Sequence, residues 1–338
     1  MTEQTKDATR AGHAPKAAPR LGVVLAALAV VYVVWGSTYL GIRVVVQEAP
    51  PLTGMGLRYL TAGVLLGAIL ALRGGVRRLA VSRRQLAGAA FLGLMLPMLG
   101  NGMVSVGENL GAPSGVTALL IAGVPLWIVL YRTICGDRPR VLTLFGVLLG
   151  FGGLAWLVLA GRGDGDRALP LLAAGIIVFA SMCWSLGSFV QPRLWLPRDV
   201  FVTTVYEMVC GGLILLTAGL VSGERFTFEY GATTWVALSY LVVFGSMLAF
   251  TSYVWLVAHA PISLVATYAY VNPVVAVFLG WMILSEPVTL PVLVGGGIVV
   301  LAVAIVITSE RPRRKPVPDT AEPEAIGSTT EAAADRRG

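Results

Sequence analysis

The sequence predicts an all-α membrane protein in which ten transmembrane helices form two inverted five-helix repeats. Three observations support this prediction: an apolar composition, ten apolar segments of membrane-spanning length, and markers that recur at a nearly constant offset. The chain has 338 residues, of which 56% are hydrophobic and 13% are charged, and its mean hydropathy is +0.80. Soluble domains do not have this balance, because about 25% of their residues are charged.

Apolar runs of about 20 residues predict transmembrane helices, since a helix needs that length to cross the hydrocarbon core of a bilayer. The ten predicted spans are 21–42, 53–72, 85–107, 111–131, 141–160, 170–190, 200–221, 234–257, 261–284 and 290–308. Polar tails flank them at 1–20 and 309–338. The tails cannot bury a core, so they are predicted to be disordered.

The two halves of the chain carry the same markers, 148 or 149 residues apart. The recurring pairs are Trp35 and Trp184, Gly63 and Gly212, Ala112-Pro113 and Ala260-Pro261, Pro125 and Pro273, and Gly146 and Gly295. The first repeat covers 21–160 and the second covers 170–308. Five spans is an odd number, so the second repeat enters the membrane from the opposite face. Many secondary transporters build two alternating conformations from repeats of this kind.

The distribution of Arg and Lys predicts the orientation, because cytoplasmic connections carry an excess of basic residues. With the N-terminus inside, 20 basic residues lie in inner segments and 4 in outer segments, and Arg58 lies within a span. Both termini are therefore predicted to be cytoplasmic in a multi-pass protein of the bacterial inner membrane. The net charge of +7 reflects this topology and does not indicate nucleic-acid binding.

Several function classes are disfavoured by what the sequence does not contain. It has no GxxxxGK[ST] loop for a nucleotide, and its three lysines, Lys6, Lys16 and Lys315, all lie in the tails. Its two histidines, His13 and His259, cannot form an intramembrane metal site or a Ser-His dyad. We therefore expect no catalytic residues, no metal and no cofactor, and we do not expect an enzyme. The expected partners are the lipid bilayer and a small-molecule substrate, and the oligomeric state stays open.

Several motifs resemble the EamA family of the drug/metabolite transporter superfamily. They are Val34-Trp-Gly-Ser-Thr-Tyr39, Gly100-Asn-Gly-Met-Val-Ser-Val-Gly-Glu108, Ala112-Pro-Ser-Gly115, Ala269-Tyr-Val-Asn-Pro-Val-Val-Ala276 and Ser285-Glu-Pro-Val-Thr289. The middle three resemble the YedA-like branch, and the last has Ser where the family has Gly. Gly136-Asp-Arg-Pro is a poorer match in the first repeat. The resemblance covers roughly 21–308. It implies ten helices in two inverted repeats, cytoplasmic termini, and export of small metabolites such as amino acids or drugs.

Two ionisable residues within spans are candidates for coupling or gating. Polar groups in hydrocarbon are costly and usually face the protein interior. Glu207 lies about 10 Å from the inner end of its span, and Arg58 lies at the equivalent position from the outer face, at about 1.5 Å per residue. Glu207 is the candidate proton or charge switch. The structural alternative is that each residue only holds helices together.

Residues that could contact a substrate lie in four spans. Trp35 and Trp184 are related by the repeat and are followed by the hydroxyls of Gly36-Ser37-Thr38 and Ser185, which suits a small amphipathic ligand. Core packing is the alternative. Asn101, Ser105 and Glu108 form one polar stripe at i, i+4 and i+7 that is expected to line the outer half of the path. The alternative for Glu108 is a solvated position at the interface.

Pro125 and Pro273 lie inside the fourth and ninth spans and are predicted to break them. Each removes one helix hydrogen bond and frees the carbonyl one turn earlier. Tyr270 and Asn272 flank the second break. Broken helices at matching positions of two repeats indicate a transporter site, and a simple hinge is the alternative.

Taken together, these residues predict a secondary active exporter that works by alternating access, with a proton as the candidate coupling ion. Trp35, Trp184 and Tyr270 would contact the body of the substrate. Asn101 and Asn272 would orient its polar ends. Two alternatives remain: an uncoupled uniporter, in which Glu207 only holds helices together, and a non-transporting membrane scaffold. A scaffold would pair all of its polar residues and leave no cavity.

Overall fold

The computed structural model describes residues 21–160, 169–260, 262–265 and 267–309, and the regular elements among them are all helical. No strand occurs among them. The predicted fold class is confirmed. The predicted disordered tails, 1–20 and 309–338, lie outside the described residues except for Ser309, which ends the last helix.

The first repeat contains eight α-helices and three η segments, of which η1 and η3 are π-helical and η2 is 3₁₀-helical. They are α1 (Leu21–Val30), η1 (Val31–Trp35), α2 (Gly36–Val45), α3 (Pro51–Gly74), η2 (Val76–Leu79), α4 (Arg83–Gly93), η3 (Leu94–Gly102), α5 (Met103–Asn109), α6 (Ser114–Ile121), α7 (Val124–Ile134) and α8 (Val141–Ala160).

The second repeat contains seven α-helices, the 3₁₀ segment η4 and the π segment η5. They are α9 (Leu171–Val190), η4 (Gln191–Arg193), α10 (Val200–Val221), α11 (Ala232–Tyr240), η5 (Leu241–Leu248), α12 (Ala249–His259), α13 (Ile262–Val265), α14 (Tyr268–Leu284) and α15 (Leu290–Ser309).

These elements match the ten predicted spans, with bounds within three residues of the predicted ones. Nine helical stretches in the described residues are long and apolar enough to cross a membrane. The ninth predicted span holds the short α13 followed by the shorter apolar helix α14. The first, third and eighth spans are each continuous helices that contain a π-helical segment.

Local sequence signals explain where several helices begin. α3 begins directly after Pro50, whose backbone is extended, and proline fits a helix start because it lacks an N–H. Ser82 and Gln85 form a capping box on α4: the Ser82 hydroxyl accepts the Gln85 N–H at 3.3 Å, and the Gln85 side chain accepts the Ser82 N–H at 2.9 Å. Asp199 caps α10 by accepting the Phe201 N–H at 3.0 Å.

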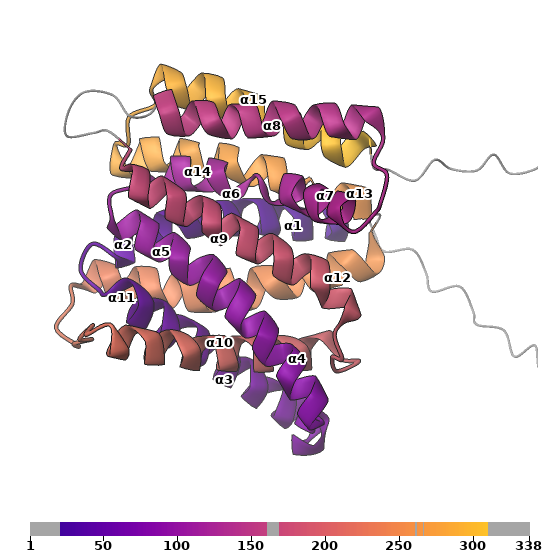
Figure 1. The fold of residues 1–338 in the computed structure, drawn as a ribbon. Coiled ribbons are helices and arrows are strands. Elements are labelled where there is room, and N and C mark those ends of the chain that lie inside the picture. Colours follow the sequence, from indigo (N-terminus) through magenta and orange to yellow (C-terminus); the bar gives the residue numbers. More distant parts are fainter. Residues whose placement is uncertain (1–20, 161–168, 261, 266, 310–338) are drawn as a thin grey trace, which may run out of the picture.

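Connections alternate between two ends of the bundle, which we call the distal and the proximal end. The distal connections are 46–50, 110–113, 222–231 and 285–289. The proximal connections are 75–82, 135–140 and 191–199. The distal end lies on the left of Figure 1. It corresponds to the outer side in the predicted topology.

Two antiparallel helix pairs reveal the inverted relation of the repeats. In the pair α3 and α10, Gly56 lies against Leu216, Gly63 against Val209 and Gly67 against Val205. Gly63 and its repeat equivalent Gly212 both lie at this contact. Small residues let helices approach closely in a membrane, where lipid supplies no hydrophobic drive for association.

The pair α8 and α15 repeats this arrangement: Gly146 lies against Val306 and Gly295 against Leu157. Gly146 and Gly295 are also equivalent in the two repeats. The two pairs lie at the bottom and the top of Figure 1, with the remaining helices between them. Each pair joins one helix to its own repeat equivalent in antiparallel orientation, as an inverted repeat requires.

The predicted proline breaks are only partly symmetric. In the fourth span, α6 ends at Ile121 and α7 begins at Val124, so Pro125 stands at the start of α7. In the ninth span, α14 begins at Tyr268 and continues through Pro273 to Leu284. Pro125 thus initiates the second part of a broken helix, whereas Pro273 lies within a helix that starts earlier.

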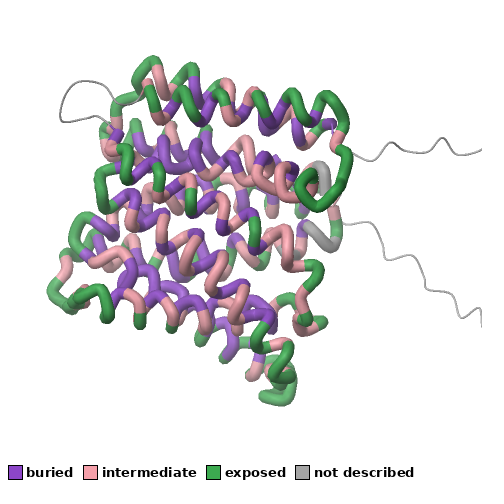
Figure 2. The backbone as a smooth tube through the Cα atoms, in the orientation of Figure 1, coloured by how far each residue is buried: buried purple, intermediate pink, exposed green. Residues whose placement is uncertain are grey.

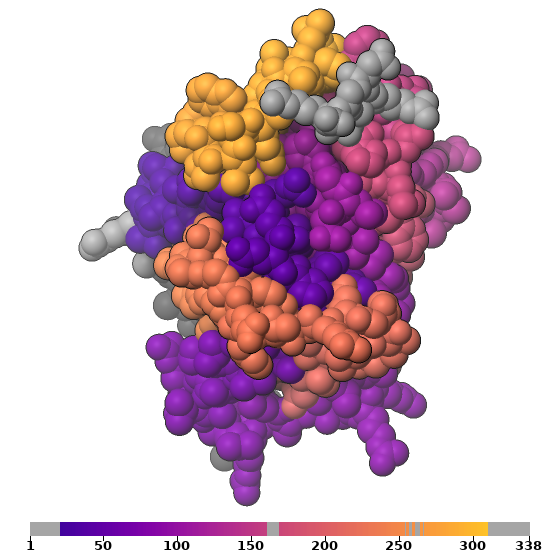
Figure 3. All heavy atoms as spheres, turned by 90° about the vertical axis from the view of Figure 1, so that its left-hand side faces the viewer, coloured from indigo at the N-terminus to yellow at the C-terminus, as the bar shows by residue number. Residues whose placement is uncertain are grey.

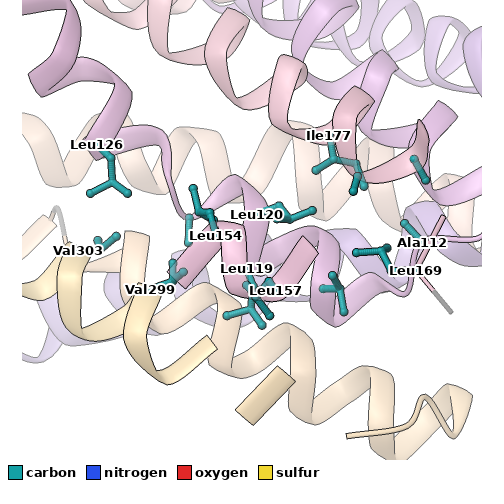
Figure 4. Packing of buried hydrophobic residues seen from close by; sticks show 14 of the residues in the cluster. Ala112, Leu119, Leu120, Leu126, Leu154, Leu157, Leu169, Ile177, Val299 and Val303 are labelled. Carbon is teal, nitrogen blue, oxygen red and sulfur yellow. The ribbon is translucent and has the colours of Figure 1, made fainter. Parts of the chain in front are cut away.

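The largest hydrophobic cluster lies where α8 and α15 cover α6, α7 and α9. Leu119, Leu120 and Leu126 meet Leu154 and Leu157 there, and all five are at least nine-tenths buried. Figure 4 shows these side chains pointing toward one another. Figure 2 shows buried backbone through the middle of the bundle and exposed faces on α8 and α15, as expected for helices that face lipid on one side.

Candidate functional site

Each of the two repeated tryptophans packs against a π-helical segment of the other repeat. Trp35, at the end of η1, donates its indole N–H to the carbonyl of Gly245 in η5 at 3.3 Å. Trp184, in α9, lies over Gly100 in η3, where an added Cβ would be 2.8 Å from its ring atom Cε3. π-Helical segments occur frequently at functional sites. We take η3, η5 and the side chains between them as the candidate site.

Trp35 belongs to an aromatic cluster. Its ring lies 5.1 Å from that of Tyr253 and 5.3 Å, edge to face, from that of Tyr268. Tyr253 and Tyr268 are themselves 5.7 Å apart. Tyr32 shares a hydrogen bond with Thr267 beside this cluster. The sequence analysis grouped Trp35 with Trp184 and Tyr270 as substrate contacts, and that grouping stays a prediction. The rings that pack against Trp35 in the structure are those of Tyr253 and Tyr268.

Arg58 links the two π segments. Its Nε–H donates to the Ser246 hydroxyl in η5 at 3.0 Å, and its Nη1–H donates to the Asn101 side-chain oxygen in η3 at 3.2 Å. The guanidinium also lies 4.8 Å from the centre of the Tyr59 ring. The Arg58 residue is only 3% exposed. One buried cation therefore fixes η3 and η5 relative to each other.

Arg58 and Glu207 occupy equivalent positions in the two repeats but do not contact each other. The α3–α10 register places Glu207 level with Leu65, seven positions along α3 from Arg58. That separation is about 10 Å along the helix axis. Arg58 is buried, whereas Glu207 is half-buried and accepts no hydrogen bond from a described residue. Arg58 and Glu207 therefore do not form an ion pair with each other in this conformation.

Three other predicted site residues already have polar partners or pack in the core. Ser37 donates to the Val34 carbonyl at 2.9 Å and shares a 2.5 Å hydrogen bond with the Tyr240 hydroxyl. Asn272, with its amide nitrogen turned toward two carbonyls, donates to Tyr32 and Tyr268 at 3.3 Å each. Tyr270 packs against the hydrophobic cluster under α8 and α15. Their substrate contacts stay predictions.

The polar stripe on the third span faces the protein interior. Ser105 is fully buried and donates to the carbonyls of Gly102 and Pro51 at 2.7 and 3.2 Å. Glu108 is 0% exposed, so it does not lie solvated at the interface. Neither of its carboxylate oxygens has a hydrogen-bond donor among the described residues. Arg43 donates to its backbone carbonyl instead.

Three glutamates at the distal end each bind the N-terminus of a helix from the other repeat. Glu224, after α10, accepts the N–H groups of Leu52 and Thr53 in α3 at 3.2 and 2.8 Å. Glu48, after α2, accepts the Gly231 N–H at 2.8 Å and the Thr234 hydroxyl at 2.6 Å. These bonds tie α10 to α3 and α2 to α11.

Glu286 makes the third of these contacts. Its carboxylate accepts the Ser114 N–H at 2.8 Å, the Ser114 hydroxyl at 2.9 Å and the Gly115 N–H at 3.1 Å. It thereby joins the α14–α15 connection to the start of α6. We call Glu48, Glu224 and Glu286 the distal carboxylates. A carboxylate is favoured at a helix N-terminus because the free N–H groups and the helix dipole both point toward it.

The hydrogen bonds of Glu48 also affect the pKa of its carboxyl group. The Thr234 hydroxyl and then the Gly231 N–H hold the pKa of the exposed Glu48 carboxyl below its ordinary value of 4.5, and a smaller desolvation effect opposes them. Figure 3 shows the distal end, where the indigo N-terminal helix, the orange α10–α11 connection and the yellow start of the last helix lie side by side.

Sequence reasoning missed most of these distal contacts. Glu286 lies in a motif that was noted for family resemblance alone, and Glu48 and Glu224 were not selected. A usable signal was present: helices that begin at Pro51 and Ser114 have no side chain of their own that caps them. Their free N–H groups require acceptors from elsewhere. The partners are distant in sequence, 172 residues apart for Leu52 and Glu224.

The proximal end has a different set of charged contacts. Arg78 and Asp199 form an ion pair between the repeats at 2.7 Å, and Arg132 pairs with Asp137 within the first repeat at 2.5 Å. Asp137 is the repeat equivalent of Glu286, yet it pairs with a side chain of its own repeat. In the part of the chain that the structure describes, no cluster of three His, Cys, Asp or Glu side chains could hold a metal ion.

Inverted helical repeats with charged side chains inside the bundle are typical of membrane transport proteins. The sequence comparisons specify the family. Residues 20–159 and 171–308 each match the EamA-like transporter family, one match for each repeat. The chain is an integral membrane protein of the EamA-like transporter family.

Relatives of known sequence extend over most of the chain. It is 36% identical over 280 residues to the uncharacterized inner membrane transporter YedA of Escherichia coli K12, covering 83% of this chain and 89% of the relative. It is 24% identical over 288 residues to the uncharacterized transporter YvbV of Bacillus subtilis, covering 85% and 92%. A crystal structure shares the fold with a TM-score of 0.59 at 18% identity, covering 87% of this chain and 100% of that chain.

Proposed function

We propose that this protein is a secondary active exporter of small metabolites, such as amino acids or drugs, and that it works by alternating access in the bacterial inner membrane. The central support is the different exposure of Arg58 and Glu207. These residues are equivalent in the two repeats, yet Arg58 is buried toward the distal end and Glu207 is half-buried toward the proximal end. A bundle in one of two alternating states would differ in this way between equivalent positions.

The distal carboxylates would hold one of these states. All three join elements of different repeats at the distal end. Opening that end requires the helix N-termini to lose their acceptors. In this proposal the distal end faces the outside, both termini are cytoplasmic, and the described conformation is closed toward the outside.

Unpaired polar groups favour a transporter over a scaffold. A scaffold would pair its buried polar atoms, but both oxygens of Glu108 and the Trp127 indole nitrogen lack partners among the described residues. The Glu207 side chain also accepts no hydrogen bond there. Unpaired groups of this kind are costly in a membrane interior and indicate a function.

Glu207 is the proposed coupling residue. It lies about 10 Å from the proximal end of α10 and is half-buried, whereas Arg58 is buried. A proton bound there from one side and released to the other would couple export to the proton gradient. The absence of a nucleotide-binding loop in the sequence supports a gradient rather than ATP as the energy source.

The test is transport into liposomes that contain purified protein, with amino acids, nucleosides and cationic drugs screened as substrates. We expect a proton gradient to drive accumulation without ATP. Glu207→Gln should abolish accumulation but preserve downhill exchange, since exchange moves the loaded carrier both ways without releasing the proton. Unchanged accumulation by Glu207→Gln would remove Glu207 from the mechanism. A requirement for ATP would overturn the secondary mechanism.

A further inference from the structure

Arg58 is a buried cation that has no counter-ion within the described part of the chain. It lies about 10 Å from the distal end of α3, at about 1.5 Å per residue, and its residue is 3% exposed. The guanidinium keeps its proton in proteins. The ion pairs among the described residues are Arg78–Asp199 and Arg132–Asp137, so no carboxylate pairs with Arg58 there. A buried charge that lacks a partner costs several kcal/mol.

The partners that Arg58 does have are neutral. Ser246 and Asn101 each accept one hydrogen bond, and the Met55 sulfur lies 3.8 Å from Nη1. Nη2 has no acceptor among the described residues. The two N–H groups of Nη2, out of five in the guanidinium, therefore have no acceptor there. Nη2 and Nη1 together form the fork of the guanidinium. A carboxylate fits such a fork with two parallel hydrogen bonds.

Gly245 in η5 packs directly against Nη2. An added Cβ at Gly245 would lie 3.3 Å from Nη2 and 3.0 Å from the Thr38 Cγ2 atom. The carbonyl of the same glycine accepts the Trp35 indole N–H. The guanidinium and the aromatic cluster thus flank one residue of η5. A solute with a carboxylate and an apolar or aromatic body could contact the guanidinium with its carboxylate and the aromatic cluster with its body.

We propose that Arg58 binds the carboxylate of the transported solute, so that the substrates are carboxylate-bearing molecules rather than cationic drugs. This inference rests on the proposed transport function and narrows its substrate class. In the closed conformation Ser246 and Asn101 accept hydrogen bonds from the guanidinium, and these bonds hold η3 against η5. A substrate carboxylate would replace these neutral acceptors with a charged one and loosen the contact between the two segments.

The experiment compares matched ligands on purified protein. L-amino acids are tested beside their carboxamides, which keep the body and the ammonium but lose the carboxylate. Binding is measured by thermal shift and by equilibrium titration. We expect at least one amino acid to bind about tenfold or more tighter than its carboxamide, because a charge-assisted bidentate pair contributes that much. Equal binding of every pair, or binding of carboxamides and amines alone, would overturn the proposal.

Variants assign the effect to Arg58. Arg58→Gln should remove the preference for the carboxylate, and Arg58→Lys should keep part of it, because the charge stays but the fork is lost. Arg78→Gln is the matched control, since it removes an arginine from the ion pair with Asp199 at the proximal end. It should keep the full preference. A preference retained in Arg58→Gln would overturn the proposal.

The outcomes separate this inference from the transport function. Gradient-driven accumulation of a carboxamide or a cationic drug, by wild type and by Arg58→Gln alike, would refute the carboxylate site and leave the transporter intact. Carboxylate binding that depends on Arg58 without any gradient-driven accumulation would support the site and refute secondary transport. If Arg58→Gln does not fold, Arg58→Lys and the ligand comparison on wild type decide the question.

Discussion

At the scale of single residues, buried charges define the candidate site. Among the described residues, Arg58 has only neutral acceptors, the Glu108 carboxylate oxygens meet no donor at hydrogen-bond geometry, and Glu207 is half-buried without a hydrogen bond. The sequence was sufficient to select all three, because charged residues inside apolar spans are rare. It could not show their partners. Whether Arg58 meets Glu207 depends on the α3–α10 register, which places them about 10 Å apart along the axis.

Glu48 gives a prediction on pH. Its pKa is lowered by the Thr234 hydroxyl, so this bond stabilises the fold fully above the ordinary value of 4.5 and less as pH falls through the lower folded value. Thr234→Val removes the donor. We expect it to lower the melting temperature at neutral pH, and we expect the difference from wild type to shrink toward about pH 3.

The control for this prediction is Thr217→Val on α10. The Thr217 hydroxyl is exposed and donates to Leu213 within its own helix, without a carboxylate partner. Melting curves across the same pH range should show no pH-dependent difference for this variant. A Thr234→Val difference that stayed constant down to about pH 3 would contradict the assigned role of the Glu48 carboxylate.

At the scale of elements, the helices were predictable and their irregularities were not. Long apolar runs gave every span, since a bilayer imposes that length. The π segments η3 and η5 were not predicted, because one extra residue in a turn hardly changes an apolar pattern. A break was predicted at Pro273, but α14 runs from Tyr268 to Leu284 and continues through this proline.

Helix packing gives a prediction at this scale. A Cβ at Gly212 would lie 2.6 Å from the Leu60 backbone nitrogen in α3, and backbone atoms cannot move aside cheaply. Gly212→Ala should destabilise the protein by about 1–3 kcal/mol, as overpacking does. Gly297→Ala is the matched control in α15, where nothing lies within 4 Å of the added atom.

For Gly297→Ala we expect a gain of up to about 1 kcal/mol, because alanine favours the helix over glycine. Thermal unfolding of both variants in the same detergent gives the comparison. If Gly212→Ala were as stable as Gly297→Ala, the close α3–α10 contact would be wrong, and with it the register that separates Arg58 from Glu207.

At the scale of the whole molecule, the inverted repeat could be predicted because its sequence markers recur at a nearly constant offset. Both antiparallel helix pairs, α3–α10 and α8–α15, join equivalent helices of the two repeats. The distal closure was not readable. Its bonds join residues far apart in the chain, such as Ser114 and Glu286 at 172 positions, and no local pattern encodes them. The sequence predicts two alternating states, but the contacts on which the proposed closure of the distal end rests appear only in the packed structure.

Membrane orientation gives a prediction at this scale. The 20-to-4 distribution of basic residues places the proximal end in the cytoplasm. On a background without Cys135, Cys183 and Cys210, Glu229→Cys should react with an impermeant maleimide in intact cells. Arg138→Cys should react only after permeabilisation. Labelling of Arg138→Cys in intact cells would reverse the topology.

The most direct test of alternating access is a distance across the distal end. It is measured by electron spin resonance between spin labels attached at Leu110→Cys and Val288→Cys. Both positions are exposed and lie in connections of different repeats. Replacing all three distal carboxylates by Gln should shift the population toward a longer distance, since each lost cap contributes about 0.5–2 kcal/mol. Arg78→Gln, at the proximal end, should not lengthen it. Identical distance distributions in wild type and the triple variant would contradict alternating access through the distal end.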